Sequence, residues 1–172
     1  MRSLRARDVP ALVALRSRAF RHSERGSPEA SAAFFRAVFL DNPWRDANLP
    51  SLVYENDGGE VCGFLGIVPR LLTLRGQTLR VAVATQLMVD PAERGLVGRR
   101  IARAYIDGPQ DLCLSDTAND AARRLWQVVG GHVSPMLSTS WVRRLRPFRH
   151  AALRLGATHR ARLLRSCRSI QD

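Results

Sequence analysis

The stretch VDPAERGLVGRR, residues 89–100, is the part of this chain that most strongly indicates its fold. It predicts a strand that ends at Val89, a short turn, and a helix that begins at Gly95. The free backbone N–H groups and the positive dipole end of a helix start favour anions. About one helix further on, NDAARRLW at residues 119–126 predicts a second helix start on an asparagine. Together the two stretches indicate a domain that binds a phosphorylated cofactor.

Both stretches resemble motifs of the Gcn5-related N-acetyltransferase (GNAT) superfamily, and the resemblance covers residues 1–146. The superfamily has a Q/R-x-x-G-x-G/A loop after its fourth strand, and Arg94 matches the first position. Val97 and Arg99 stand in the two small-residue positions of that loop. The later pattern of the superfamily is N-x-x-A-x-x-L-Y-x-x-x-G. Its counterparts here are Asn119, Ala122, Leu125 and Gly130, with Trp126 where tyrosine is usual.

The resemblance implies an α/β fold of the α+β type, in which a central mixed β-sheet is flanked by helices. It also implies a function, the transfer of an acetyl group from acetyl-CoA, as co-substrate, to an amine of a small molecule or peptide. The backbone of Met88 and Val89 would hold the thioester and pantetheine, and Asn119 and Trp126 would line the thiol end. The residues implied at the pyrophosphate are Arg94, Gly95, Leu96, Val97, Gly98 and Arg99.

The residues of the loop support a phosphate site by their own chemistry. The amides of residues 96–99 would point at a pyrophosphate, and glycine at 95 and 98 would let the backbone approach it closely. The side chains of Arg94, Arg99 and Arg100 add positive charge. The alternative is a polar loop followed by an exposed helix start.

No residue of the chain is assigned as the catalytic acid or base. An indole N–H has no acidity comparable to a phenol, so Trp126 cannot replace the usual tyrosine acid, and a core role is its alternative. Asn119 has the alternative of a helix cap, in competition with Thr117. The candidate bases are Asp90, Asp116 and Glu55, and the first two also suit turns or caps. Neither Tyr54 nor Tyr105 matches the motif, and the four histidines show no metal spacing, so no metal is expected.

Hydrophobic periodicity and turn signals predict the order β-α-α-β-β-β-β-α-β-α-β. Asp8 and Ser27 are the predicted caps of the first two helices. The remaining predicted elements are strands at 1–6, 51–55, 61–68, 71–74, 79–89, 112–114 and 136–145 and helices at 95–107 and 118–129. This alternation requires a mixed sheet with helices on both faces.

The positive charge of the chain is concentrated at its C-terminal end. Residues 1–131 hold 18 Arg and 14 acidic residues, whereas residues 132–172 hold 9 Arg and Asp172 alone. The resemblance implies a GNAT-like domain at residues 1–146, and the break at Pro147 together with the charge predicts an Arg-rich tail, helical or mobile, at residues 147–172. The apolar stripe from Leu153 to Leu164 would pack on a partner, either a second copy of the chain in a homodimer or a missing second domain.

Composition excludes several other classes of protein. Cys62, Cys113 and Cys167 are widely spaced and indicate neither a disulfide framework nor a zinc site. The sequence shows neither a signal peptide nor a membrane-spanning run, so a cytoplasmic bacterial protein without a membrane partner is expected. A nucleic-acid partner is not expected, because Phe148 is the only aromatic residue in the tail.

Two interpretations of function rival an acetyltransferase. Trp126 and the imperfect loop favour a non-catalytic acyl-CoA-binding or regulatory module, or a fragment of a tandem acetyltransferase. The retained Arg94, Gly95 and Asn119 favour an enzyme. A third interpretation, an Arg-rich nucleic-acid binder, depends on the tail alone.

Overall fold

The computed structural model describes residues 1–20, 27–115 and 118–135, and Met1–Ser134 form one compact unit. A second unit begins at Pro135, the last described residue. The strands are β1 (Arg2–Ser3), β2 (Leu52–Glu55), β3 (Val61–Leu74), β4 (Gln77–Val89) and β5 (Leu112–Ser115). The α-helices are α1 (Val9–Ala19), α2 (Pro28–Phe35), α3 (Leu96–Ile106) and α4 (Asp120–Val128). Short helical turns lie at η1 (Ala6–Asp8), η2 (Arg36–Leu40) and η3 (Pro91–Glu93).

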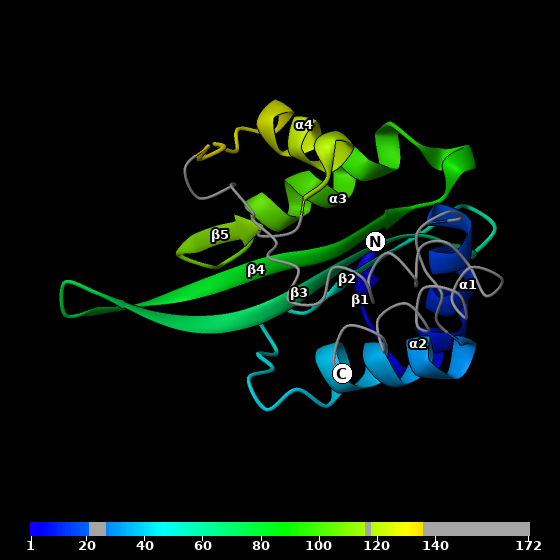
Figure 1. The fold of residues 1–172 in the computed structure, drawn as a ribbon, viewed down its shortest axis with the longest axis horizontal. Helices are drawn as coiled ribbons and strands as arrows, with labels where there is room; N and C mark the ends of the chain where they lie inside the picture. The colour runs from blue at the N-terminus through cyan, green and yellow to red at the C-terminus, as the bar shows by residue number, and fades with distance from the viewer. Residues whose placement is uncertain (21–26, 116–117, 136–172) are drawn as a thin grey trace, which may run out of the picture. The chain divides into compact units, whose positions relative to one another are not determined.

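The five described strands form one mixed sheet in the order β1-β2-β3-β4-β5 (Figure 1). Strands β1 to β4 pair with their neighbours in antiparallel fashion, whereas β5 runs parallel to β4. The connection from β4 to β5 contains α3, as a crossover between parallel strands requires. The predicted mixed sheet flanked by helices is confirmed.

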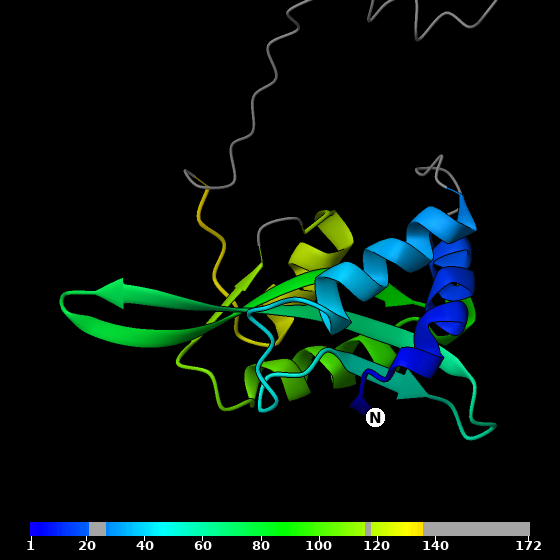
Figure 2. The ribbon, with the colours of Figure 1, turned by 90° about the horizontal axis from the view of Figure 1, so that it is seen from below.

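The buried side chains of the central strands point alternately to the two faces of the sheet and so form two core clusters. Phe64 and Met88 belong to the cluster that packs beneath α1 and α2, whereas Leu65 and Ala84 belong to the cluster beneath α3. Successive side chains of a strand point to opposite faces, so one run of apolar residues supplies both clusters. Figure 2 shows α1 and α2 packed side by side against the sheet. The central strands are thus buried on both faces.

The two predicted strands at 61–68 and 71–74 are one strand, β3, so the prediction of separate strands was wrong. Pro69 does not break it, because β2 pairs with β3 only as far as Leu65. The Ile67 N–H donates to Ser51 Oγ on the β2 side at 3.0 Å. Backbone N–H groups of a strand point alternately to its two edges, so the Pro69 nitrogen faces the same edge as the Ile67 N–H. No strand pairs with β3 at that edge beside Pro69, so the N–H that proline lacks is not needed there. Beyond this point β3 and β4 continue as a two-stranded hairpin, which projects to the left in Figure 1.

The prediction that the Asp8 side chain caps α1 was also wrong. Asp8 occupies the N-cap position, but its carboxylate makes no bond to the first turn of α1. It accepts hydrogen bonds from Arg2 Nη1 at 2.7 Å and Nη2 at 2.8 Å, and from the Arg5 N–H at 2.8 Å. Arg2 also contacts Glu55 at the end of β2. The carboxylate thus ties the start of the chain to the sheet.

The predicted helices at 95–107 and 118–129 agree with α3 and α4 within two residues at their ends. Ser27 caps α2 by accepting from the Ala30 N–H at 3.2 Å. The predicted strand at 1–6 is limited to Arg2–Ser3 and is followed by η1. The predicted strand at 136–145 and the predicted domain boundary at residue 147 lie outside the described residues. Within the described ranges, no helix is long and apolar enough to cross a membrane.

Candidate functional site

The edge of β4 becomes free where β5 ends. The two strands pair only from Val81 with Leu112 to Ala84 with Ser115. Strand β4 then continues to Val89 while its other edge stays paired with β3. In the described part of the chain, the backbone from Thr85 to Val89 therefore has no strand partner on the β5 side. Such a split leaves hydrogen-bonding groups available to a ligand.

A β-bulge lies in this same segment of β4. Phe64 pairs with Met88 and Gly66 pairs with Thr85, so Leu65 alone lies opposite Gln86 and Leu87. The extra residue places Gln86 in the left-handed region, at φ 51°. Bulges redirect side chains and interrupt pairing next to functional sites. Here the bulge shifts the strand at the point where β4 and β5 separate.

A pocket of about 250 Å³ occupies the split between the strands. Its walls come from β4, from the end of β5, from α4 and from Phe20 after α1. The complete lining is Phe20, Leu65, Ala84, Thr85, Gln86, Leu87, Ser115, Ala118, Asn119, Ala122 and Trp126. Two of the predicted site residues, Asn119 and Trp126, thus lie in the same pocket. Its described polar side chains are all uncharged.

Asn119 serves as the N-cap of α4. Its Oδ1 accepts a hydrogen bond from the Ala122 N–H at 2.9 Å, and its backbone is extended. The side-chain oxygen thus satisfies one of the free donors at the helix start. The same residue lines the pocket, so the cap also positions the beginning of α4 at the site.

Trp126 packs against Tyr105 at the inner side of the pocket. Their ring centroids are 5.4 Å apart, at an interplanar angle of 57°. The Tyr105 hydroxyl lies 2.5 Å from the Ala82 carbonyl and 3.0 Å from the Leu114 carbonyl, and it accepts from the Leu114 N–H at 3.1 Å. Burial raises the pKa of Tyr105 above its ordinary value. Tyr105 therefore joins β4 to β5 and is unsuited to act as an acid.

The start of α3 carries the predicted pyrophosphate residues. Gly95 is the N-cap with φ 106°, a conformation that favours glycine. The N–H groups of Leu96, Val97 and Gly98 precede the first intrahelical bond and have no backbone partner among the described residues. The prediction that the Arg99 N–H is also available to an anion was wrong, because this N–H donates to the Gly95 carbonyl at 3.3 Å. Three amides, not four, are thus available to an anion.

The side chains of these residues point in different directions. Val97 is 4% exposed and packs in the core beneath α3, so its bulk lies away from the free amides. Gly98 is buried, and a Cβ there would lie 3.4 Å from Leu125 Cδ2 and 3.8 Å from Val89 Cγ2. Both distances are ordinary van der Waals contacts, so the packing of α3 on α4 and on the end of β4 would accept a Cβ at this position. Within residues 94–99, Val97 and Gly98 are thus buried, and the other four residues are exposed.

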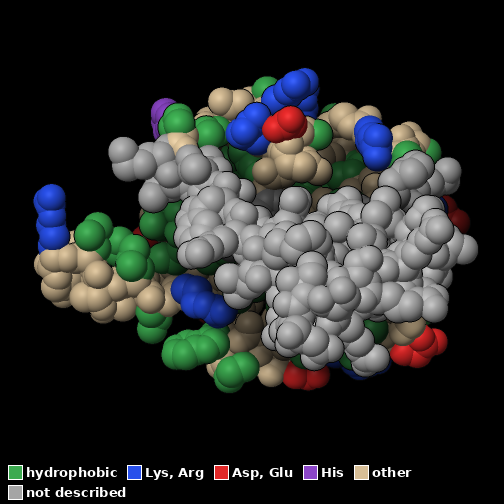
Figure 3. Space-filling model, viewed as in Figure 1, with side chains coloured by type: hydrophobic (Ala, Val, Ile, Leu, Met, Phe, Trp, Pro, Cys, Tyr) green, Lys and Arg blue, Asp and Glu red, His purple; other side chains and the backbone are tan. Residues whose placement is uncertain are grey.

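Arg94, Arg99 and Arg100 are exposed around this helix start. Arg100 Nη1 donates to the Tyr54 hydroxyl at 2.5 Å. Figure 3 shows basic side chains along the layer of α3 and α4 at the top of that view, with an acidic side chain among them. These positive charges strengthen the attraction of the helix start for a phosphate.

Met88 and Val89 follow the pocket residues on β4. The Met88 side chain is 1% exposed and belongs to the core beneath α1 and α2. The Asp90 N–H donates to the Cys62 carbonyl at 2.8 Å, and Val89 lies opposite Gly63. Because antiparallel pairs alternate, the Val89 N–H and carbonyl face away from β3, toward the open edge. The backbone of Val89 is therefore available between the pocket and α3.

Two of the three candidate bases already have partners. Asp90 Oδ2 contacts Arg18 Nε at 2.6 Å, and Oδ1 accepts from the Ala92 N–H at 3.1 Å as the cap of η3. The Arg2 guanidinium lowers the pKa of Glu55. Each of these two carboxylates thus already contacts an arginine. Asp116, the third candidate, lies outside the described residues.

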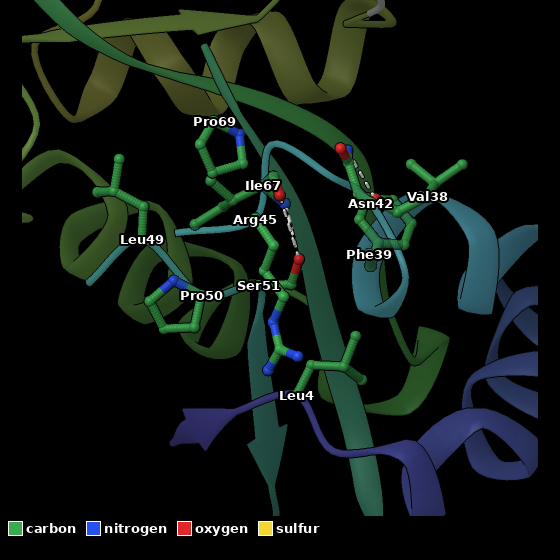
Figure 4. Close-up of a pocket in the computed structure, with 10 residues that line it drawn as sticks. All are labelled: Leu4, Val38, Phe39, Asn42, Arg45, Leu49, Pro50, Ser51, Ile67 and Pro69. Carbon is green, nitrogen blue, oxygen red and sulfur yellow. Dashed lines mark hydrogen bonds between the residues drawn. The ribbon is translucent and has the colours of Figure 1, made fainter. Parts of the chain in front are cut away.

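A larger hollow, of about 390 Å³, is lined by residues 43–47, 49, 69–71 and 80 and includes no residue of α3 or α4. The hollow in Figure 4, between the chain after α2 and strand β3, measures about 10 Å³ and has room for little more than one water molecule. In it Ser51 bonds to Ile67, and Asn42 Nδ2 donates to the Val38 carbonyl at 3.1 Å. The described residues contain no cluster of three His, Cys, Asp or Glu side chains that could hold a metal ion.

Sequence reasoning missed most of the pocket lining, notably Gln86, Thr85 and Ser115. One signal was present, because Thr85 and Gln86 are polar residues inside the otherwise apolar run at residues 81–89. The bulge itself has no local signal, because it depends on how β4 pairs with β3.

No protein-family model matches this sequence, and no curated protein matches it. Solved structures do match the fold. The aminoglycoside antibiotic 6'-N-acetyltransferase of Acinetobacter baumannii is 18% identical with a TM-score of 0.57, over 83% of this chain and 95% of that one. A ribosomal-protein-alanine N-acetyltransferase from Brucella melitensis is 16% identical with a TM-score of 0.55, over 84% and 98%. A transcriptional regulator from Bacillus halodurans is 21% identical with a TM-score of 0.58, over 83% and 96%. The fold is thus that of the GNAT acetyltransferases.

Proposed function

We propose that this chain is an N-acetyltransferase that moves an acetyl group from acetyl-CoA to an amine of a small molecule or peptide. The observation that carries the proposal is the pocket at the split between β4 and β5, which lies on the same strand that leads into α3. One end offers a polar cavity of about 250 Å³, and the other offers three free amides and exposed arginines. This arrangement suits a long ligand with a phosphate end and a reactive end.

The proposed roles follow from the positions of the residues. The amides of Leu96, Val97 and Gly98 would bind the pyrophosphate, with charge from Arg94 and Arg99. The outward N–H of Val89 would donate to the pantetheine or to the thioester oxygen, where negative charge develops during acyl transfer. Asn119 and Trp126 would line the thiol end. The acceptor amine would attack the thioester carbon, and the thiol would leave as the amide forms.

A second function, a non-catalytic acyl-CoA-binding module, is favoured by the chemistry of the described pocket lining. Its polar side chains are Thr85, Gln86, Ser115 and Asn119, which are neither acids nor bases near neutral pH. Trp126 adds no acid to this set. The transcriptional regulator from Bacillus halodurans has the same fold. We propose the cytoplasm as the location in either case, because the cysteines show no disulfide or metal spacing.

Calorimetric titration with acetyl-CoA, followed by detection of thiol release with a panel of amines, tests the proposal. An N-acetyltransferase should bind acetyl-CoA and release thiol faster with at least one amine than with buffer alone. Binding without amine-dependent release would support the module instead. If neither acetyl-CoA nor CoA binds, both functions are wrong.

A further inference from the structure

Gln86 has a backbone conformation that a side chain rarely adopts. Its φ is 51°, and Arg75 in the hairpin turn is the only other described non-glycine residue with a positive φ. A turn explains Arg75, because it precedes Gly76 in the tip that joins β3 to β4. Gln86 lies inside a strand, where the β-bulge imposes the positive φ on a residue that is not glycine. Strained residues inside regular elements are concentrated at functional sites.

The side chain of Gln86 is also short of partners. Its Oε1 is shielded from solvent and accepts no hydrogen bond in the described part of the chain. A buried polar atom without a partner destabilises the fold, so such atoms are uncommon. The terminal torsion of a glutamine is broad, so a turned amide is an allowed conformation of the side chain. Gln86 lines the pocket, and a turn of its amide can present the oxygen to a ligand there.

Gln86 differs in this respect from the other amide in the pocket. The Oδ1 of Asn119 is already engaged by the Ala122 N–H. The Gln86 carboxamide is thus a polar group of the lining with an unused buried acceptor. A ligand that supplies an N–H donor would satisfy it.

We infer that the Gln86 carboxamide is a ligand-binding group that accepts a hydrogen bond from an N–H of the molecule in this pocket. The N–H comes either from an amide of the pantetheine arm or from the acceptor amine. The inference deepens the proposed acetyl transfer and rests on it. The strain and the unpaired oxygen at residue 86 are then retained because they serve binding.

Three variants of residue 86 test the inference, and Arg75 supplies a matched control. Gln86→Met keeps the length of the side chain and removes its hydrogen bonds. Gln86→Glu keeps acceptor oxygens and removes the N–H donors. Gln86→Gly removes the side chain and relieves the positive φ, and Arg75→Gly relieves the same kind of strain away from the pocket. For each protein, thermal unfolding, the affinity for acetyl-CoA and the rate of thiol release are measured.

Gln86→Met and Gln86→Gly should lose about tenfold in acetyl-CoA affinity or in the rate of amine-dependent thiol release, the size expected for one lost hydrogen bond. Gln86→Glu should retain more of that property than Gln86→Met. Gln86→Gly and Arg75→Gly should both unfold at or above the parent temperature, and Arg75→Gly should bind and react like the parent. A fall in acetyl-CoA affinity identifies the pantetheine as the donor, and a fall in rate alone identifies the acceptor amine.

The inference is overturned if Gln86→Met and Gln86→Gly stay within twofold of the parent in both measurements. It is also overturned if the parent binds acetyl-CoA, shows no thiol release, and the variants bind equally well. Residue 86 is purely structural if Gln86→Gly unfolds at a lower temperature and its losses follow the unfolded fraction. If the parent itself does not bind acetyl-CoA, the proposed function fails first, which is a different result.

Discussion

Trp126 shows at the scale of a single residue why a motif position does not by itself define a chemical role. The indole packs on Tyr105 and lines the pocket, so it contributes shape at the position where the motif that the sequence resembles has tyrosine. Tyr105 lies beside it but is committed to the backbone of β4 and β5. Neither aromatic side chain therefore supplies an acid.

Trp126→Tyr should leave acetyl-CoA binding intact and leave the rate of thiol release unchanged or higher, because a phenol can protonate a leaving thiolate and an indole cannot. Trp126→Ala should weaken acetyl-CoA binding and destabilise the domain by about 2–3 kcal/mol through lost packing. Calorimetry, thiol release and urea unfolding measure the two effects. A large loss of rate in Trp126→Tyr with unchanged binding would show that the indole itself is required.

Asp8 gives a prediction about acid sensitivity. Its side chain is 5% exposed and is bonded to Arg2, which lowers the pKa of the carboxyl. Asp8→Asn should reduce the free energy of unfolding near pH 7 by about 2 kcal/mol, the size expected for hydrogen bonds to a charged group. Because the folded pKa is lowered, this stabilisation is present above the unfolded pKa of about 3.9 and is lost as the pH falls through the folded value.

Urea unfolding at neutral pH and in acid tests this direction of the pH dependence. The difference between Asp8→Asn and the parent should shrink in acid. Asp57→Asn is the control, because Asp57 is an exposed carboxylate in the turn between β2 and β3 and should change little. A difference that is independent of pH would contradict a role for the ionised carboxylate.

At the scale of the element, α3 combines packing with a free N-terminus. Its inner face buries Val97, Ile101 and Tyr105 against the sheet, while Leu96 at its first position is 61% exposed. The exposed and buried positions of one turn can therefore be changed separately. This separation allows the anion site to be tested without disturbing the core.

Leu96→Glu should affect stability and binding in opposite directions. A negative charge at the first turn of a helix stabilises it by about 0.3–1 kcal/mol through the helix dipole. The same charge should repel a pyrophosphate and weaken acetyl-CoA binding by about tenfold or more. Leu74→Glu makes the same charge change at an exposed hairpin position and should not alter affinity. Equal affinities of Leu96→Glu and the parent would place the phosphate site elsewhere.

The Tyr105 hydroxyl stabilises the pairing of β5 with β4 through its hydrogen bonds to both strands. Tyr105→Phe should lower the free energy of unfolding by about 1–3 kcal/mol, because backbone groups of β4 and β5 lose a buried partner. The rate of thiol release per folded molecule should not change, since the hydroxyl is structural. Tyr54→Phe removes a hydroxyl bonded to exposed Arg100 and should have little effect on stability. A slower reaction in fully folded Tyr105→Phe would contradict the structural role.

At the scale of the whole molecule, the proposed site residues all lie within the unit Met1–Ser134. That part of the chain is near charge balance, because residues 1–131 hold 18 Arg against 14 acidic residues. The segment from residue 132 onward is strongly basic, with 9 Arg and one acidic residue. The contribution of the basic segment to folding and to acetyl-CoA binding can therefore be measured by removing most of it.

A chain that ends at Arg146 should keep the unfolding transition and the acetyl-CoA affinity of the full chain. It should lose any self-association, because the stripe from Leu153 to Leu164 is removed. Sedimentation measures association, and calorimetry measures affinity. If this truncation unfolds the domain or abolishes binding, residues beyond Arg146 belong to the core and the predicted boundary at residue 147 is wrong.

The sequence by itself determined the features that depend on neighbouring residues. Ser27 and Asn119 cap helices, Gly95 begins α3, and the apolar run before Val89 is a central strand. Helix caps, turns and hydrophobic periodicity depend on a few neighbouring residues, so they can be predicted without the rest of the chain. The mixed sheet flanked by helices followed from these local signals and from the motif resemblance.

Only the tertiary structure decided the features that depend on partners distant in the sequence. The bulge at Gln86 exists because Leu65 alone lies opposite two residues of β4, and the pocket lies where β5 stops at Ser115 while β4 continues. Asp8 binds Arg2 instead of capping α1, and Pro69 sits within one long strand because β2 has already ended. Register and strand length are set by the summed pairing and burial of whole strands, and no short stretch of sequence contains that sum.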